Sequence, residues 1–305
     1  MADSVRRKVL GFILLVTHIG AGAFAQIVPP TQSRPFDGWY HKTWSPDKIH
    51  RSENGSIGLT LDHDDGSGYG SRNLYLFGYI STAIKLVAGD SSGVVTAYYL
   101  SSNSSESDHD ELDFEFLGNK SGEPYILQTN VFANGIGRRE QRVYLWFDPT
   151  AGYHNYSVIW NKEIIIFSVD EVPIRVFKNN ENLGVGYPRT KPMGIYSTIW
   201  DGESWATRGG RDKIDWTQAP FVASFGNFII DACWAATSSG NSSTGHNMIS
   251  SSAATSDNWW GQPGFQSLDA NLQTQLKLVK QYYMIYDYCT DSPRYPVAPP
   301  ECATN

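Results

Sequence analysis

Short stretches in which apolar and polar residues alternate dominate the chain from residue 57 to about residue 228. Gly, Asn, Asp and Pro separate these stretches. Successive side chains of a β-strand point to opposite faces, so a period of two is typical of strands that bury one face. We expect strands at 56–61, 73–77, 81–87, 93–100, 109–117, 125–132, 141–147, 153–160, 163–169, 172–177 and 193–200. Many short strands joined by turns predict an all-β sandwich.

The spacing of hydrophobic residues changes toward the C-terminus. Leu268, Leu272, Leu276 and Val279 recur at i, i+4, i+8 and i+11, which predicts one amphipathic helix. A strand with tyrosines on both faces is expected after it, at 282–288. The stretch before the helix is rich in Ser, Asn, Gly and Thr, as surface connections are. We therefore expect a β domain at 26–232, a variable surface linker at 233–257 and a C-terminal extension at 258–305.

The N-terminus has the pattern of a secretory signal peptide. Three basic residues at 6–8 precede an apolar run at 9–16, and small residues end at Ala25. We expect residues 1–25 to be removed and the protein to be secreted. No segment approaches the roughly twenty apolar residues of a membrane span.

The charge balance disfavours two classes of partner. The formal net charge is −7, and loss of Arg6, Arg7, Lys8 and Asp3 with the signal would move it to −9. An acidic surface disfavours nucleic acid and anionic membranes. Charged residues are only 18% of the chain, while Trp, Tyr and Phe make up 13%, which suits a neutral, hydroxyl-rich ligand that stacks on rings.

The stretch 109–117 carries the candidate chemistry. On a strand, Glu111, Asp113 and Glu115 would share one face, while Leu112 and Phe114 would be buried on the other. Carboxyls this close push their pKa values apart, so that one can stay protonated while another is an ionised nucleophile. That is the equipment of a retaining glycoside hydrolase.

Three other interpretations of the same stretch are a solvated acidic strand face, a calcium-binding edge and a helix. Calcium usually takes its ligands from a flexible loop, whereas these acids alternate with bulky apolar residues. The period of two also argues against a helix. A rigid sheet is therefore favoured.

Five N-x-Ser/Thr sequons occur, at Asn54, Asn103, Asn119, Asn155 and Asn241. Asn119 directly follows the acidic strand after Gly118, and we expect glycosylation there. Three cysteines are present. Cys289 and Cys302 enclose a short Pro-rich segment, and a disulfide closing that loop would contribute about 3 kcal/mol. Cys233 would then be buried or would pair between chains.

The stretch His109-Asp110-Glu111-Leu112-Asp113-Phe114-Glu115-Phe116-Leu117-Gly118-Asn119 resembles the signature of plant xyloglucan endotransglucosylase/hydrolases, a branch of glycoside hydrolase family sixteen. The resemblance covers essentially the whole chain after residue 25. It includes the stretches at 75–78, 98–102, 128–132, 139–142, 205–210, 283–286, 288–291 and 299–302. It implies a concanavalin-like β-jelly-roll sandwich with a substrate cleft on the concave face and a short C-terminal extension of one helix and one strand.

The resemblance also implies roles for the three acids. Glu111 would be the nucleophile, Glu115 the general acid and then the general base, and Asp113 would hold the nucleophile. Strand residues four apart have Cα atoms roughly 13 Å apart, while the carboxyls of a retaining pair lie about 5 to 5.5 Å apart. The two glutamates must therefore lean toward Asp113 on a curved strand.

Substrate contacts are implied in the same way. The matching residues are His109, Gln128, Asn130, Arg139, Glu140, Arg142, Trp200, Trp205, Ala206, Gly210, Tyr286 and Arg294. Two departures from the family are visible. Arg138 stands where relatives often have Asp or Asn, and Cys233 lacks the cysteine with which its counterpart usually pairs.

The expected function is that of a secreted, wall-modifying enzyme. It would cut the β-1,4-glucan backbone of xyloglucan and pass the covalently held fragment to another xyloglucan chain, with minor hydrolysis. Donor and acceptor chains would be its partners, and we expect a monomer without metal or organic cofactor. A hydrolase of xyloglucan or mixed-linkage β-glucan and a lectin-like binding module are the alternatives.

Overall fold

The computed structural model describes residues 32–102, 107–237 and 258–304. The predicted signal peptide, the sequons at Asn103 and Asn241 and most of the predicted linker lie outside these ranges. No helix within them is long and apolar enough to cross a membrane.

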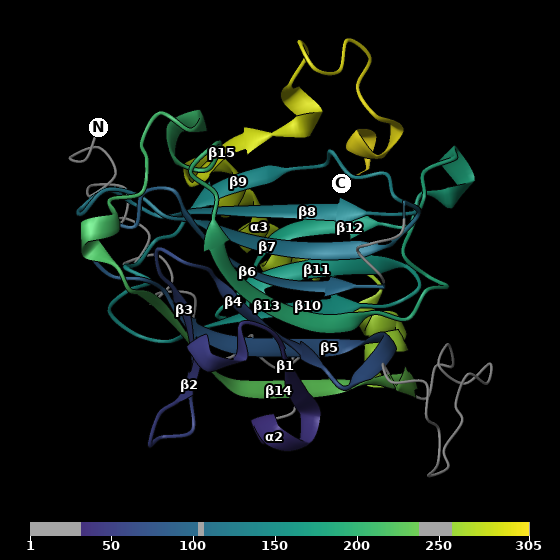
Figure 1. Ribbon diagram of the computed structural model, residues 1–305. Helices are drawn as coiled ribbons and strands as arrows, with labels where there is room; N and C mark the ends of the chain where they lie inside the picture. The colour runs from purple at the N-terminus through teal and green to yellow at the C-terminus, as the bar shows by residue number, and fades with distance from the viewer. Residues whose placement is uncertain (1–31, 103–106, 238–257, 305) are drawn as a thin grey trace.

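Two antiparallel sheets form a sandwich (Figure 1). The eight-stranded sheet has the order β1 (Tyr40–Trp44), β4 (Ser67–Ser71), β13 (Gly194–Asp201), β6 (Val94–Ser101), β7 (Glu111–Leu117), β8 (Ile126–Phe132), β9 (Gln141–Tyr144) and β15 (Met284–Asp287). The seven-stranded sheet has the order β12 (Val172–Lys178), β11 (Ile164–Val169), β10 (His154–Trp160), β5 (Asn73–Lys85), β14 (Phe221–Thr237), β3 (Ile57–Leu61) and β2 (Ile49–Arg51). The prediction of an all-β jelly-roll sandwich is confirmed.

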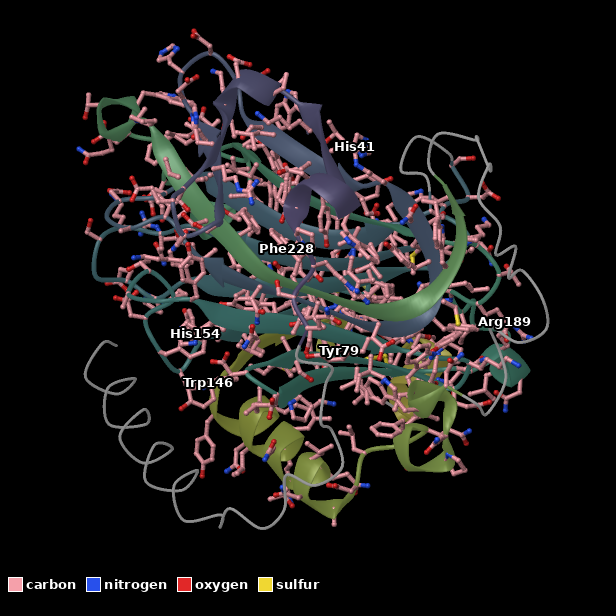
Figure 2. The ribbon with its side chains drawn as sticks, turned by 90° about the horizontal axis from the view of Figure 1, so that it is seen from below. His41, Tyr79, Trp146, His154, Arg189 and Phe228 are labelled. Atoms are coloured by element: carbon pink, nitrogen blue, oxygen red, sulfur yellow. A yellow bond between two sulfur atoms is a disulfide. The ribbon has the colours of Figure 1, made fainter. Side chains whose placement is uncertain are left out.

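The alternation in the sequence explains how the sheets face each other. Leu112, Phe114 and Phe116 of β7 are fully buried between them. Phe114 meets Phe167 of the opposite sheet edge-on, with ring centroids 5.2 Å apart. At one side of the sandwich the short helix α2 (Phe36–Trp39) adds Phe36, whose ring lies 5.9 Å from that of Phe228 in β14. Figure 2 shows β14 as a long green strand with Phe228 labelled. Because the inner faces are filled by apolar side chains, the polar faces of the strands point outward.

Most of the predicted strands are present, with boundary differences. The stretches predicted at 73–77 and 81–87 are parts of one strand, β5, which passes through Gly78 without leaving the sheet. Gly78 has a φ of 148°, and a Cβ there would lie 2.3 Å from the side chain of Ala232 on β14. Glycine is therefore required for close strand contact, although it resembles a strand break in the sequence.

Four strands were not predicted. They are β1, β2, β4 and β14. β4 reads Ser-Gly-Tyr-Gly-Ser, which has no apolar alternation, so its place depends on pairing with β1 and β13. β14 runs to Thr237, beyond the predicted end of the β domain at 232.

The C-terminal extension completes the eight-stranded sheet. Helix α3 (Ala270–Tyr282) begins after Asp269, whose side chain accepts a hydrogen bond from the backbone N–H of Leu272 at 2.8 Å. α3 packs against β12, and Val279 is fully buried there. β15 then pairs with β9 at the sheet edge (Figure 1), which makes the strand predicted at 282–288 shorter than expected.

A disulfide joins Cys289 to Cys302, as predicted. Cys233 is not part of it, and its sulfur accepts a hydrogen bond from the side chain of Asn258 at 3.2 Å.

Candidate active site

β7 lies near the middle of the eight-stranded sheet, and strand register brings outward-facing residues of its neighbours into rows across it. Asp113 is opposite Tyr99 of β6 and Asn130 of β8. In the adjacent row, Glu115 is opposite Ala97 and Gln128. A groove of about 420 Å³ lies over these rows. Its lining consists of Ala97, Tyr99, Glu111, Asp113, Glu115, Gln128, Asn130, Phe132, Glu140, Thr198, Trp200 and Trp205.

The three carboxyls on the floor of this groove are largely removed from water. Asp113 is 6% exposed, and the side chain of Glu111 is 15% exposed. Burial raises the pKa of all three groups, because each ion loses hydration. The effect is strongest for Asp113, whose pKa is raised further by the charges of Glu111 and Glu115 on either side.

A hydrogen bond joins Asp113 to Glu111. Burial and the two neighbouring acids hold the pKa of Asp113 well above its usual range, and this bond raises it further while it lowers the pKa of Glu111, so Asp113 donates the hydrogen bond and the Glu111 carboxylate accepts it. His109 also favours the ionised form of Glu111, with its Nε2 3.9 Å from Glu111 Oε2. Two strand residues apart, the side chains of Glu111 and Asp113 can meet only if they incline toward each other. The inclination of both glutamates toward Asp113 stays a prediction.

Glu115 belongs to a polar chain that crosses three strands. Gln128 Nε2 donates to Glu115 Oε2 at 2.5 Å, and Arg142 Nε donates to Gln128 Oε1 at 2.6 Å. The guanidinium thereby fixes the orientation of the Gln128 amide, whose N–H points at the carboxyl. Burial raises the pKa of Glu115, and the hydrogen bond from Gln128 lowers it. The negative charges of Glu111 and Glu140 raise this pKa, and the Arg142 cation lowers it.

The C-terminal extension reaches the groove through Arg294. Its Nη1 and Nη2 donate to the two carboxylate oxygens of Glu140 at 2.6 and 3.2 Å. Nη1 also donates to Tyr286 Oη at 3.1 Å. The ring of Tyr286 in turn lies 5.5 Å from the guanidinium of Arg142. Glu140, Arg142, Tyr286 and Arg294 therefore form one continuous cluster at the β9–β15 side of the groove.

Two tryptophans line the other part of the groove. The rings of Trp200 and Trp205 are 6.1 Å apart and inclined by 39°. Ala206 is buried beneath them with Val95 and Leu117. Gly210 has a φ of 82°, and a Cβ there would lie 2.2 Å from the carbonyl oxygen of Ser204. Both residues therefore shape the loop after β13, which carries Trp205, and neither is part of the groove lining.

Arg139 does not lie where a substrate contact was expected. Its side chain is 9% exposed and its Nε donates to Glu301 Oε1 at 2.8 Å, inside the fold. The next residue, Glu140, does line the groove. His109 lies beside the groove, where it stacks on Phe132 at 5.2 Å and faces Glu111. Of the expected contacts, the groove lining includes Gln128, Asn130, Glu140, Trp200 and Trp205. The expected contacts outside this lining are His109, Arg139, Arg142, Ala206, Gly210, Tyr286 and Arg294.

Several lining residues were not singled out from the sequence. Tyr99 and Ala97 lie on β6, Thr198 on β13 and Phe132 on β8. Tyr99 and Ala97 are two positions apart in the predicted strand at 93–100, so the sequence predicts that they share a face. Their place beside the acids depends on which strand pairs with β7. The sequence does not state that partner.

Asn119 lies at the turn after β7 and is partly exposed. Its Nδ2 donates to the carbonyl oxygen of Pro124 at 3.0 Å. Glycosylation of Asn119 stays a prediction.

An antiparallel jelly roll whose outward face carries three adjoining acids beneath a groove defines a glycan-processing enzyme. Residues 36–218 match the glycosyl hydrolases family 16 model, and residues 254–302 match the xyloglucan endo-transglycosylase C-terminus model. The chain belongs to the xyloglucan endotransglucosylase/hydrolases of glycosyl hydrolase family 16.

Curated relatives match over most of their length. A probable xyloglucan endotransglucosylase/hydrolase protein 5 of Arabidopsis thaliana is 50% identical over 296 residues, which cover 96% of this chain and 97% of the relative. A probable xyloglucan endotransglucosylase/hydrolase protein of Nicotiana tabacum is 53% identical over 269 residues, 88% of each chain.

Solved structures share the fold at lower identity. The Bacillus licheniformis beta-glucanase superposes with a TM-score of 0.54 at 22% identity, covering 67% of this chain and 98% of that one. The apo Crh5 transglycosylase superposes with a TM-score of 0.51 at 24% identity, covering 66% and 82%. At these identities the likeness supports the jelly roll alone.

Proposed function

We propose that this protein is a secreted xyloglucan endotransglucosylase that works by retaining double displacement. The observation that carries the proposal is the row of Glu111, Asp113 and Glu115 on the floor of one groove. The names of the relatives support xyloglucan as the substrate. The signal pattern at residues 1–25 supports export to the cell wall.

In the first step, Glu111 attacks the anomeric carbon of the donor glucan as a carboxylate. Glu115 gives its proton to the glycosidic oxygen, the C–O bond breaks, and the new chain end leaves as an alcohol. The environment supports these roles. Burial raises the pKa of both glutamates, but His109 and the hydrogen bond from Asp113 favour ionised Glu111, whereas the negative charges of Glu111 and Glu140 raise the pKa of Glu115 further.

In the second step, Glu115 accepts a proton from an incoming hydroxyl, which attacks the anomeric carbon and releases Glu111. If the hydroxyl belongs to another xyloglucan chain, the product is a transferred glucan. If it belongs to water, the glycosyl-enzyme intermediate is hydrolysed and the product is a glucan with a new reducing end. Stacking of the acceptor on Trp200 and Trp205 would raise its effective concentration at the intermediate, so we expect transfer to predominate.

The experiment mixes polymeric xyloglucan with labelled xyloglucan oligosaccharides. It measures two products, labelled polymer and new reducing ends. We expect label to enter polymer with few new reducing ends. Reducing ends without label incorporation would indicate a hydrolase, and binding without either product would indicate a lectin-like module.

The Glu111→Ala variant tests the nucleophile directly. We expect loss of both products by a factor of about 10⁴ or more, with glucan binding largely kept. Glu163→Gln, which removes an exposed carboxyl in the turn between β10 and β11, is a matched control that should behave as wild type. Turnover of the wild-type order in Glu111→Ala would overturn the role given to Glu111.

A further inference from the structure

The segment 138–140, between β8 and β9, is held by the C-terminal extension at three consecutive residues. Tyr295 Oη donates to the carbonyl oxygen of Arg138 at 2.6 Å, Arg139 Nε donates to Glu301 Oε1 at 2.8 Å, and Arg294 donates to Glu140 at 2.6 and 3.2 Å. Arg138 has a φ of 64°, in the left-handed region, which long side chains seldom adopt and which Asn and Asp tolerate better. The extension therefore holds this segment in a conformation that its own sequence does not favour.

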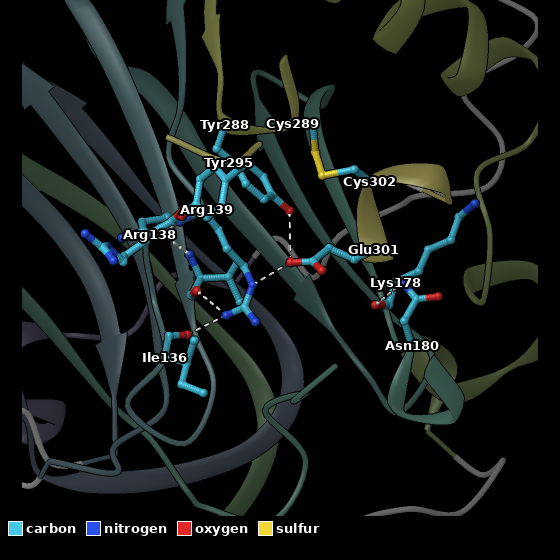
Figure 3. Close-up of polar contacts among 12 residues, drawn as sticks. Ile136, Arg138, Arg139, Lys178, Asn180, Tyr288, Cys289, Tyr295, Glu301 and Cys302 are labelled. Atoms are coloured by element: carbon cyan, nitrogen blue, oxygen red, sulfur yellow. Dashed lines mark hydrogen bonds and ion pairs between the residues drawn. A yellow bond between two sulfur atoms is a disulfide. The ribbon is translucent and has the colours of Figure 1, made fainter. Parts of the chain in front are cut away.

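The central contact is a buried ion pair. The side chains of Arg139 and Glu301 are 9% and 3% exposed. Arg139 also donates to the carbonyl oxygens of Val131 and Ile136, and Tyr288 Oη donates to the same Glu301 oxygen at 3.3 Å. Figure 3 shows Glu301, next to the disulfide, receiving both contacts. The hydrogen bonds of this guanidinium thus lie within the fold.

The backbone of Arg139 acts on the groove through Asn130. Its N–H donates to Asn130 Oδ1 at 3.0 Å, and the N–H of Val131 donates to the same oxygen at 2.9 Å. Because two backbone donors occupy this oxygen, Asn130 can offer the groove only its NH₂ group. In register, Asn130 is opposite Asp113. The position of Arg139 therefore contributes, together with the Val131 N–H, to the orientation of the Asn130 amide beside the catalytic row.

We propose that Arg139 and Glu301 are a positioning pair, through which the C-terminal extension fixes the Asn130 amide and the Glu140 carboxylate beside the catalytic acids. The extension thus serves the cleavage step. This inference rests on the roles proposed above for Glu111 and Glu115.

The extension has a second connection to the jelly roll that does not involve segment 138–140. Asn180 Nδ2 donates to Thr304 Oγ1 at 2.8 Å, and Lys178 donates to the carbonyl oxygen of Thr304. In Figure 3, Lys178 and Asn180 lie on the opposite side of Glu301 from Arg139. Thr304 Oγ1 donates to the backbone carbonyl oxygen of Glu301 at 3.0 Å, not to its carboxylate. Asn180→Ala therefore loosens the extension while leaving the side-chain ion pair of Arg139 and Glu301 intact, and serves as the matched control.

The test compares Glu301→Gln, Arg139→Gln, the double variant and Asn180→Ala. Thermal unfolding is measured first, and kinetics are then taken well below every Tm. In both single variants we expect kcat to fall about tenfold or more for transfer and hydrolysis alike, with the acceptor KM within about twofold. The double variant should lose little more than either single variant, since a pair that acts as a unit is not additive. Amide hydrogen exchange at the Arg139 N–H should accelerate in all three.

Asn180→Ala should lower Tm but keep wild-type kcat and wild-type exchange at Arg139. If Glu301→Gln and Arg139→Gln lower Tm while kcat and exchange at Arg139 match wild type, the pair is only a stability device and the inference is wrong. Failure of the proposed function has a different signature. In that case the wild-type protein forms no transfer product, or Glu111→Ala keeps wild-type turnover. Amide exchange at the Arg139 N–H still tests the positioning pair.

Discussion

Two groups of buried charges lie on either side of β8, and they are built on opposite principles. On the groove side, Glu111, Asp113 and Glu115 are three acids in a row, and their proximity raises the pKa of Asp113. On the other side, Glu301 is an acid paired with the cation of Arg139. Adjoining acids raise each other's pKa, so one of them keeps a proton that can be transferred. An oppositely charged pair instead fixes the positions of its two groups. Removal of an acid should therefore have opposite effects on stability at the two places.

Glu301→Ala should give the largest loss of stability in this comparison. It leaves the Arg139 cation buried without its partner, and such losses cost about 3–5 kcal/mol. Urea unfolding at pH 7 measures the change in the free energy of unfolding, and Glu301→Gln, which keeps an acceptor oxygen, should lose less. A loss below about 1 kcal/mol for Glu301→Ala would mean that water or a rearranged side chain compensates the charge.

Asp113→Asn should lower activity and raise stability at neutral pH. Activity should fall about a hundredfold or more, because the amide cannot reproduce the proton that Asp113 shares with Glu111. The pKa of Asp113 is raised in the folded protein, so the folded state binds more protons than the unfolded state above about pH 4. Wild-type stability therefore falls as pH rises through the interval between the unfolded and folded pKa values.

The amide introduced by Asp113→Asn does not titrate. A comparison of Tm against pH for the variant and the wild type therefore measures how much the titration of Asp113 changes stability. They should coincide near pH 4 and differ by a few degrees at pH 7, with the variant the more stable. A variant that is less stable at pH 7 would show that hydrogen bonds of Asp113 outweigh the repulsion between the acids.

The same contrast explains what the sequence could and could not predict. The face shared by Glu111, Asp113 and Glu115 follows from local alternation, which a strand preserves wherever it pairs. The direction of Arg139 could not be predicted in this way, because its partner Glu301 is 162 residues away along the chain. β4 was not predicted for a related reason, because its glycines are required by contacts with side chains on neighbouring strands. A Cβ at Gly70, for example, would lie 2.7 Å from the ring of Tyr196. The family resemblance predicted substrate contacts in the segment 139–142, but it could not say which of its side chains face the groove.

The smallest effects should come from the two charges that act on Glu115 from opposite sides. Arg142 and the Gln128 amide that it orients lower the pKa of Glu115, so Arg142→Met should raise that pKa and move the alkaline limb of kcat/KM to higher pH. Glu140 raises the pKa of Glu115, and its removal also frees the Arg294 cation, so Glu140→Gln should move the same limb to lower pH. Each shift should be a fraction of a pH unit to about one unit, because both charges are partly exposed to water.

Profiles of kcat/KM against pH measure both shifts. Arg142→Lys is the control, because it keeps the cation and should shift the limb less than Arg142→Met. Shifts of the same sign in Arg142→Met and Glu140→Gln would mean that the limb reports another group, and the assignment of Glu115 as the acid would have to be revised.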